Sequence, residues 1–298
     1  GSALFAAIEV DWPSGLVDNL TSVPANSTLT IIEGSAAPAA HAENISTRLD
    51  VQTGAQVGIG GFIVTGSSPT KVLVRGLGPS LAASGVQGVL ADPVLELHEQ
   101  DGTVLTNNNW RDTQESEIEA AGLAPTNDAE SALVAELAPG AYTAILSGED
   151  GGTGIGLVEA FDLGRGVVSE LANVSTRGFV GTGDNVLIGG VIIGPSDGST
   201  ATTVVRAIGP SLAKAGVDGS LSDPVLELHD GAGEVIASND DWQDDPAQAA
   251  ALTALGLDPA DPRESALDVT LDPGDYTAIV SGKSGGTGVA LVEVYEIK

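Results

Sequence analysis

The chain has 298 residues, with no cysteine or methionine, and it carries 41 acidic against 11 basic residues, for a formal net charge of −30. The missing cysteines exclude a disulfide framework, a zinc site with cysteine ligands and a thiol nucleophile. The acidic charge argues against nucleic acid and anionic membranes as partners, because both require a basic patch. No apolar run approaches the roughly 20 residues of a membrane-spanning helix.

Charged residues make up only 17% of the chain and hydrophobic residues 42%, so the sequence predicts a folded protein rather than a disordered acidic tail. Forty glycines and 3% aromatic residues suit short strands better than long helices. Because no methionine begins the chain, we expect a processed amino terminus and a secreted, extracellular protein whose signal peptide has been removed; the alternative is that the Gly-Ser start is a remnant of cloning.

Residues 1–42 form an N-terminal arm and linker with no counterpart elsewhere in the chain. We expect Ala3–Asp11 to form a strand that ends at Trp12-Pro13, because side chains of alternating position would line its two faces. A second short strand is expected at 28–32, before an Ala/Pro-rich extended linker at 35–42. The arm residues expected to make assembly contacts are Leu4, Phe5, Ile8, Val10 and Trp12.

Two copies of one repeat follow the arm, and we place them at 43–164 and 165–298. Residues 75–98 (RGLGPSLAASGVQGVLADPVLELH) and 206–229 (RAIGPSLAKAGVDGSLSDPVLELH) are identical at 17 of 24 positions. PGAYTAILSGEDGGTGIGLVEAF at 139–161 likewise matches PGDYTAIVSGKSGGTGVALVEVY at 273–295. Each repeat has the size of one domain.

Within each repeat the hydrophobic period is mostly two, which predicts strands around 72–74, 94–97, 142–146 and 156–161. One helix is expected at Ala247–Leu255, after the capping pair Asp245-Pro246 and before Gly256, and its counterpart is expected at Thr113–Ala121. The sequence therefore predicts an all-β fold of two tandem immunoglobulin-like or jelly-roll-like β-sandwich domains, preceded by an extended N-terminal strand arm.

The second half of each repeat combines ELHEQDG (96–102) or ELHDGAG (227–233) with a Pro-Gly-x-Tyr-Thr-Ala segment, and NDDW follows at 239–242. This combination resembles the β-sandwich modules appended to secreted bacterial proteins, including the pre-peptidase C-terminal type. The whole pattern is similar to repeats strung along large secreted proteins of environmental bacteria. The resemblance covers both repeats but not residues 1–42, and it implies an extracellular binding or structural module without catalytic residues.

Acidic and amide side chains crowd one loop of repeat two and supply the hard oxygen ligands that calcium prefers. The spacing does not match an EF-hand loop, and a solvated loop is the alternative interpretation. His98 and His229 end equivalent Leu-Glu-Leu segments and are expected to be structural rather than metal ligands. The candidate calcium ligands are Asn239, Asp240, Asp241 and Asp244.

Four further features are interpreted as structural. The Gly-Pro-Ser segments at 78–80 and 209–211 lack the G-x-S-x-G spacing of a nucleophile elbow, and the Gly-Gly-Thr-Gly segments at 151 and 285 lack the context of a phosphate loop, so both predict turns. Arg75 and Arg206 are expected to pair with Glu159 and Glu293, respectively. Trp110 and Trp242 are expected to anchor the core.

Four Asn-x-Ser/Thr sequons are candidate glycosylation sites, at Asn19, Asn26, Asn44 and Asn173. The first functional hypothesis is a subunit of an extracellular, pilus-like filament, in which the N-terminal strand inserts into a neighbouring copy and gives a helical homopolymer. This layout resembles donor-strand fibre subunits in architecture. The alternative is a monomeric adhesin or carbohydrate-binding module with glycans as partners. We predict no enzymatic activity, because no nucleophile–base pair or metal constellation can be assembled outside the repeat scaffold.

Overall fold

The computed structural model describes residues 4–13, 17–24, 41–163, 169–194 and 200–297. Strands dominate these residues and every pairing between named strands is antiparallel, so the expected all-β class is confirmed. The N-terminal strands are β1 (Leu4–Asp11) and β2 (Val17–Pro24). Repeat one contains β3 (His41–Val51), β4 (Gly58–Gly66), β5 (Thr70–Leu77), β6 (Pro93–His98), β7 (Val104–Asn107), β8 (Ser131–Leu137), β9 (Gly140–Gly148) and β10 (Gly154–Asp162).

Repeat two contains the equivalent strands in the same order. They are β11 (Ser169–Val180), β12 (Leu187–Gly194), β13 (Ala201–Ile208), β14 (Pro224–Asp230), β15 (Val235–Asn239), β16 (Ser265–Leu271), β17 (Gly274–Gly282) and β18 (Gly288–Ile297). The α-helices are α1 (Glu115–Ala120), α2 (Pro210–Lys214) and α3 (Pro246–Leu255), and short 3-10 helices are η1 (Gly54–Gln56), η2 (Pro79–Ser84), η3 (Glu149–Gly151) and η4 (Lys283–Gly285).

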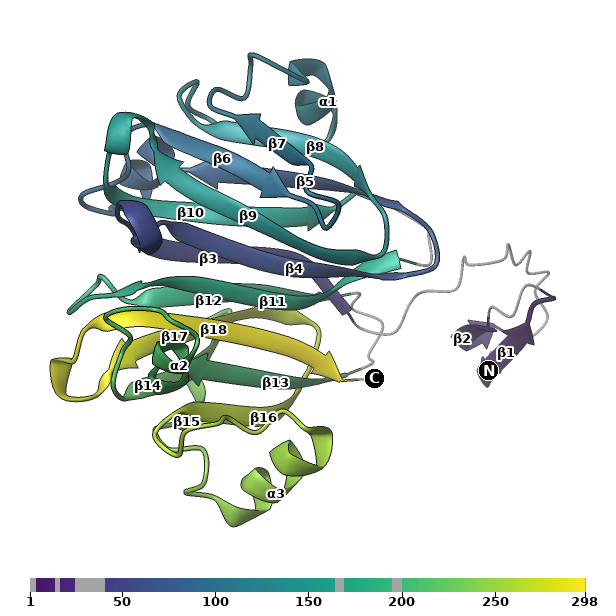
Figure 1. Cartoon of the computed structure of the whole chain (residues 1–298). Helices are drawn as coiled ribbons and strands as arrows, with labels where there is room; N and C mark the ends of the chain where they lie inside the picture. Colours follow the sequence, from purple (N-terminus) through teal and green to yellow (C-terminus); the bar gives the residue numbers. More distant parts are fainter. Residues whose placement is uncertain (1–3, 14–16, 25–40, 164–168, 195–199, 298) are drawn as a thin grey trace.

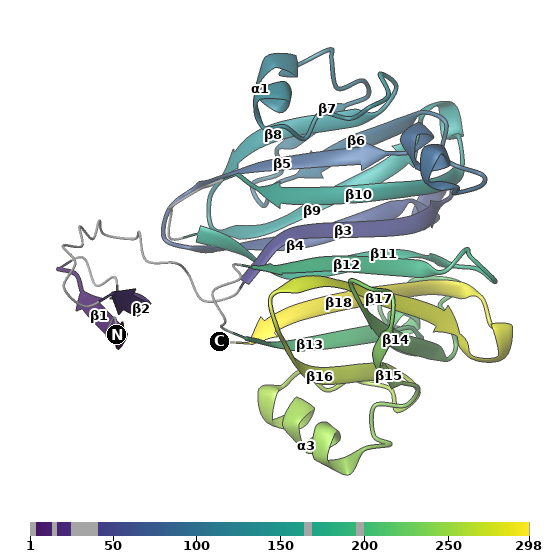
Figure 2. The ribbon, with the colours of Figure 1, turned by 180° about the vertical axis from the view of Figure 1, so that it is seen from behind.

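The 16-stranded sheet follows two continuous paths that run through both repeats. The first layer has the order β8-β5-β10-β3-β12-β17-β14-β15, and the second layer has the order β16-β13-β18-β11-β4-β9-β6-β7. The two layers face each other as in a β-sandwich, with α1 and α3 at opposite ends (Figures 1 and 2).

Each layer crosses from one repeat to the other at its centre. β3 pairs with β10 of its own repeat on one side and with β12 of repeat two on the other. Likewise β11 pairs with β18 of its own repeat and with β4 of repeat one. The strands of different repeats therefore lie side by side in the middle of the molecule (Figure 1). The domain bounds 43–164 and 165–298 stay predictions.

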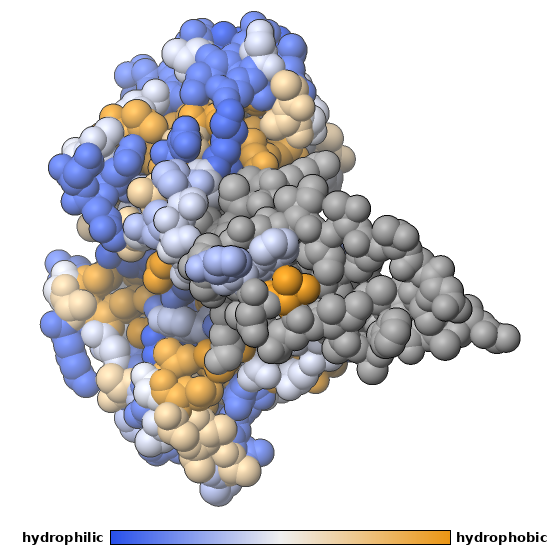
Figure 3. All heavy atoms as spheres, turned by 90° about the vertical axis from the view of Figure 1, so that its right-hand side faces the viewer, coloured by the Kyte–Doolittle hydropathy of each residue, from blue (hydrophilic) through white to orange (hydrophobic). Residues whose placement is uncertain are grey.

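One continuous core lies between the layers and includes residues of both repeats, among them Leu49, Leu97, Leu187 and Val280. The period-two pattern explains this core, because alternate residues of each strand point inward. Strand β6, for example, buries Pro93, Leu95 and Leu97 and leaves the alternate residues Val94, Glu96 and His98 half-buried. Hydrophilic side chains cover much of the upper part of the face in Figure 3, with apolar atoms between them.

The helix predicted at Ala247–Leu255 is present as α3, which begins one residue earlier. Asp245 caps it by accepting hydrogen bonds from Ala247 N (2.8 Å) and Gln248 N. Gly256 ends it at φ +68°, in the left-handed region that glycine adopts freely. The counterpart α1 is shorter than the predicted 113–121.

The N-terminal strand expected at Ala3–Asp11 is present as β1, and it pairs with β2 as a two-stranded sheet of its own. The pairing of β1 with a following strand was not predicted, because the polar residues of 17–24 interrupt the hydrophobic alternation. The strand expected at 28–32 lies outside the described residues.

Candidate functional site

The outer edge strands β8 and β16 are covered by side-chain amides. Gln114 donates from Nε2 to Val134 O (2.7 Å) and accepts at Oε1 from Val134 N (3.1 Å). In repeat two, Gln248 donates to Ala266 O (3.2 Å) and accepts from Asp268 N (3.0 Å). Unpaired sheet edges recruit further strands, so these amides disfavour strand addition to β8 and β16.

The other two outer edges, β7 and β15, are more open. Within the described ranges, β7 pairs only with β6 and β15 only with β14, and no side-chain amide bridges their outer backbone groups. Val104 on β7 is 44% exposed, and Val235 and Ile236 on β15 are 52% and 45% exposed. These short edges therefore present unpaired backbone and apolar side chains together.

A groove of about 530 Å³ runs beside β15, between that strand and the start of α3. Val225 and Leu267 line it, together with the carboxylates of Glu227, Asp240, Asp244 and Asp245. A groove of this charge favours cationic ligands over anionic ones.

Three carboxylates gather at one end of repeat two. Oxygen atoms of Asp223, Asp240 and Asp241 all lie within 4.8 Å of one another. The ammonium group of Lys283 lies among them, 2.6 Å from Asp240 Oδ2 and 3.9 Å from an oxygen of each of the other two. The ammonium of Lys283 therefore offsets part of the negative charge of the three carboxylates.

Burial raises the pKa of Asp241, the neighbouring ammonium of Lys283 lowers it, and Asp240, Asp223 and Asp244 raise it again, so that the net shift is upward. The hydrogen bond to Asp240 is the main reason that the pKa of Lys283 is also raised. Both upward pKa shifts are expected where several carboxylates surround one cation, because the carboxylates repel one another's charge and stabilise that of the ammonium.

Repeat one replaces this cluster with a different set. The equivalents of Asp240, Asp241 and Lys283 are Asn108, Asn109 and Glu149, and only Asp92 keeps its type. One buried oxygen of Asp92 and one of Asn108 have no hydrogen-bond partner, and the same holds for Asp223 and Asp240 in repeat two. Both repeats thus have buried side-chain oxygens without a hydrogen-bond partner at the same two positions, but the charges of the surrounding side chains differ.

The predicted calcium residues are only partly brought together. Asp240 and Asp241 belong to the carboxylate cluster, but Asn239 uses its amide to accept from Ala266 N (2.9 Å) and to donate to Asp241 O. Asp244 is exposed at the groove. Asp223 and Lys283 were not predicted as part of this cluster, because they lie in other segments. Asp223 comes directly before Pro224 at the start of β14, and Lys283 lies in the turn between β17 and β18.

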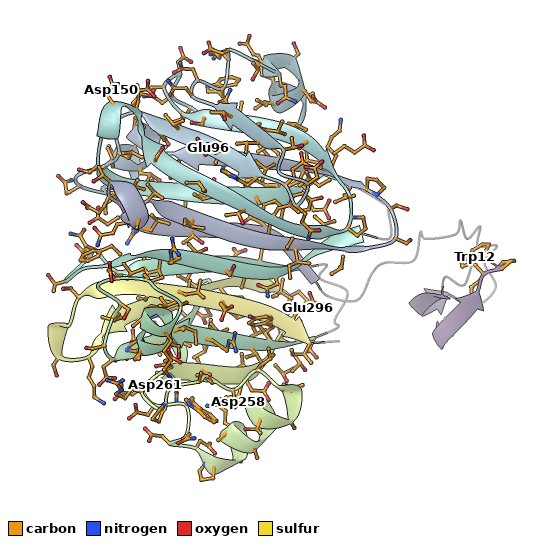
Figure 4. All side chains as sticks on the ribbon, in the orientation of Figure 1. Trp12, Glu96, Asp150, Asp258, Asp261 and Glu296 are labelled. Carbon is orange, nitrogen blue, oxygen red and sulfur yellow. The ribbon has the colours of Figure 1, made fainter. Side chains whose placement is uncertain are left out.

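The two histidines sit on the outer faces of their strands. His98 Nε2 lies 2.9 Å from Glu96 Oε2, and His229 Nε2 lies 3.3 Å from Glu227 Oε2. Figure 4 labels Glu96 on β6. Neither histidine joins a group of three metal-type ligands among the described residues, whose one such group is the carboxylate cluster.

The Gly-Pro-Ser segments fold around buried glutamates that the sequence analysis missed. Glu264 is fully buried and accepts from Gly209 N (3.1 Å), Ser211 N (2.8 Å), the Ser211 hydroxyl (2.8 Å) and Asp261 N (3.1 Å). Figure 4 shows Asp261 in the segment before β16. Glu130 binds the equivalent segment of repeat one. The expectation of a simple turn is wrong: Pro79–Ser84 form a 3-10 helix and Pro210–Lys214 form α2, and the glutamate before β8 or β16 binds the first residues of each.

The arginine pairs predicted from the sequence are confirmed. Arg75 Nε lies 2.5 Å from Glu159 Oε2, and Arg206 Nη2 lies 2.6 Å from Glu293 Oε2. Arg206 also donates to Leu257 O (3.0 Å), as Arg75 does to the equivalent carbonyl in repeat one. These contacts hold the segment after each helix against the sheet, which is a structural role.

The two tryptophans and the glycine-rich turns also behave as expected. Trp110 and Trp242 are buried in small clusters beneath α1 and α3. The segments around Gly151 and Gly285 form single turns between β9 and β10 and between β17 and β18. A Cβ atom at Gly148 would lie 2.2 Å from Gly152 O, so the tight closure of that turn requires glycine.

The expected assembly residues all lie on β1 or directly after it. Leu4, Phe5, Ile8 and Val10 belong to β1, and Trp12 follows the strand (Figure 4). In the register of the hairpin, Ile8 lies opposite Leu20 on β2.

The four sequons differ in their surroundings. Asn44 is only 6% exposed in the middle of the first layer, which leaves no room for a glycan on the folded chain. Asn173 is half-buried on β11 beside Tyr295. Asn19 lies on β2, and Asn26 lies outside the described residues.

Comparisons with known proteins add little. No family model matches the chain, and no curated protein matches it. Among solved structures, a DUF4785 family protein from Legionella pneumophila is similar at 8% identity and TM-score 0.25, covering 92% of this chain and 87% of that one. The STIV MCP is similar at 12% identity and TM-score 0.23, covering 87% and 94%. A mutant of Bacillus subtilis oxalate decarboxylase OxdC gives 7% identity and TM-score 0.15, covering 85% and 69%. TM-scores this low support no argument about function.

None of the helices in the described ranges is long and apolar enough to cross a membrane.

Proposed function

We propose that this protein is a non-enzymatic, extracellular structural subunit that polymerises head to tail through its N-terminal strand. The observation that carries the proposal is the strand pairing of β1. Within the described ranges β1 pairs only with β2, and neither strand joins the 16-stranded sheet. A two-stranded sheet alone is at best marginally stable in water, so the hairpin needs a further surface to pack against.

The body of the molecule offers two such surfaces. β8 and β16 are covered by amides, whereas β7 and β15 keep open edges beside the exposed side chains of Val104 and Val235. Strand addition to an open edge gains affinity from main-chain hydrogen bonds and specificity from alternate side chains. A contact between the arm of one subunit and the edge of the next is heterologous, and repeated heterologous contacts give open helical filaments.

The finer features of the proposal rest on the sequence. They are the immunoglobulin-like or jelly-roll-like character of each repeat, its kinship with the sandwich modules of secreted bacterial proteins, and its extracellular location. The proposal includes no cofactor, and Lys283 Nζ lies 2.6 Å from Asp240 Oδ2 within the carboxylate cluster.

Electron microscopy of the purified chain tests the proposal. Three proteins are compared in negative stain and by sedimentation: the full chain, a version lacking residues 1–12, and the variant Ile8→Asp. A charge at position 8 introduces a large desolvation penalty into any buried strand. The matched control is Leu255→Asp, which places the same charge at an exposed apolar residue of α3.

We expect filaments from the full chain and from Leu255→Asp, and monomers from the other two. Filaments from Ile8→Asp would contradict the strand-mediated contact. Monomers from all four proteins would favour the monomeric adhesin or carbohydrate-binding module instead.

A further inference from the structure

The contact between the two repeats, here called the repeat joint, is formed mainly by the pairings β3 with β12 and β4 with β11, beside a single pairing of Asp50 on β3 with Phe179 on β11. The two main pairings are equivalent residue by residue. Ser46 lies opposite Gly190 and Thr47 opposite Gly189 in one; Ser175 lies opposite Gly61 and Thr176 opposite Gly60 in the other. The offset of 129 residues between the repeats converts each pair into its counterpart.

At the centre of the joint a residue meets its own counterpart. The hydroxyl oxygens of Thr47 and Thr176 lie 2.6 Å apart, and both threonines are buried, at 1% and 0% exposure. A residue that contacts its own copy marks a two-fold axis, and an interface around such an axis is self-complementary. The two repeats are therefore related as the subunits of a symmetric dimer.

The close approach of backbone and side chain is duplicated as well. A Cβ atom at Gly61 would lie 2.5 Å from the Ser175 hydroxyl, and one at Gly190 would lie 2.5 Å from the Ser46 hydroxyl. Each repeat thus contains both of the strands that pair in the joint: one with the sequence Asn-x-Ser-Thr-Arg and one with Gly-Gly. The sequons at Asn44 and Asn173 are part of this Asn-x-Ser-Thr-Arg strand. The pairing of the repeats therefore explains why they recur at equivalent positions, and glycosylation is not needed to explain it.

From this symmetry we infer that the repeat joint is a docking surface for a second copy of the chain. A repeat of one molecule can pair with a repeat of another through the contacts that it makes within its own chain. The two arrangements contain the same hydrogen bonds and the same buried area, so the choice between them depends on concentration. Exchange of an identical element between protomers is a low-cost route to dimers. This inference is independent of the N-terminal strand.

Engineered thiols test the inference, because the chain has no cysteine of its own. Full-length Thr47→Cys and Thr176→Cys are mixed, unfolded and refolded together at about 1 mM, the effective concentration typical of a short linker. They are then oxidised and run on a non-reducing gel. The double variant shows whether the two positions close a disulfide within one chain. Ser116→Cys, an exposed residue of α1, measures random collision.

We expect a disulfide-linked species of twice 29.7 kDa from the mixture, at least about tenfold above the Ser116→Cys control, and an internal disulfide in the double variant. A monomeric mixture beside an internally cross-linked double variant overturns the inference, and so does a double variant that forms no disulfide. As a readout free of thiols, the unmodified chain refolded over a range of concentrations should give a rising share of dimer in gel filtration; a constant share contradicts exchange. Filaments built by the arm do not affect these results, because the thiols lie at the joint.

Discussion

The threonine pair at the repeat joint allows a sharp test of the fold through Thr47→Val and Thr176→Val. Valine keeps the shape of threonine and removes only the hydroxyl's hydrogen bonding. Either single substitution leaves the other hydroxyl buried without its partner, whereas the double substitution removes both polar groups from the core. The 2.6 Å contact between the two oxygens makes these outcomes differ.

A buried hydroxyl that loses its partner costs about 1–3 kcal/mol, while replacing both partners by apolar groups of the same shape is nearly neutral. Each single variant should therefore lose about 1–2 kcal/mol, and the double variant should lose less than either. The coupling free energy in the double-mutant cycle, the sum of the two single losses minus the loss of the double variant, is then roughly 1–4 kcal/mol in magnitude. Each kcal/mol corresponds to roughly 2–4 °C in Tm for a chain of this size.

Chemical denaturation of the four proteins measures the cycle. Thr203→Val is a matched control: Thr203 is also buried, but its hydroxyl has no partner, and repeat one already has Val72 at that position. The control should leave stability unchanged or raise it. If the losses of the two joint variants simply add in the double variant, the hydroxyls do not meet and the symmetric joint is wrong.

Three further predictions follow from the contacts. Glu264→Gln should cost about 1.5–3 kcal/mol in urea denaturation, because the neutral amide weakens the charge-assisted hydrogen bonds to a buried group, whereas Glu227→Gln, at a half-exposed side chain, should change stability little. Gln248→Ala uncovers the edge of β16 and should increase aggregation in light scattering, while Gln243→Ala, at an exposed position, should not; equal behaviour of the two variants would show that the amide protects nothing. Burial, together with a hydrogen bond to a carboxylate, raises the pKa of Tyr295 above its ordinary 10.0, so its contribution to stability is present below pH 10.0 and is lost as the pH rises through the higher folded value; Tyr295→Phe should flatten that alkaline loss in a pH series of thermal melts.

Local features of this fold could be predicted from the sequence because they depend on neighbouring residues. The helix α3 follows from Asp245, Pro246 and Gly256, each with a fixed position at a helix end. The pairing of Arg206 with Glu293 follows from the scarcity of basic residues and from the repetition of both residues at equivalent positions.

The joint could not be predicted in this way. The alternation of side chains in a strand shows which face is buried, but it does not show which other strand pairs with each edge. From the sequence, Thr47 is therefore only one more residue that points inward. Glu264 reads as a surface acid, because the backbone groups that satisfy it come from a segment more than 50 residues away. The carboxylate cluster joins Asp223, Asp240 and Lys283 from three separate segments, and only the folded sheet brings them together.

The most direct test of the proposed function is electron cryo-microscopy of the assembled full-length protein, at a resolution that separates strands. We predict that residues 4–11 lie as an added strand against an open outer edge, β7 or β15, of the neighbouring subunit. A map in which these residues contact only their own subunit, with neighbours joined by other surfaces, would contradict assembly by strand addition.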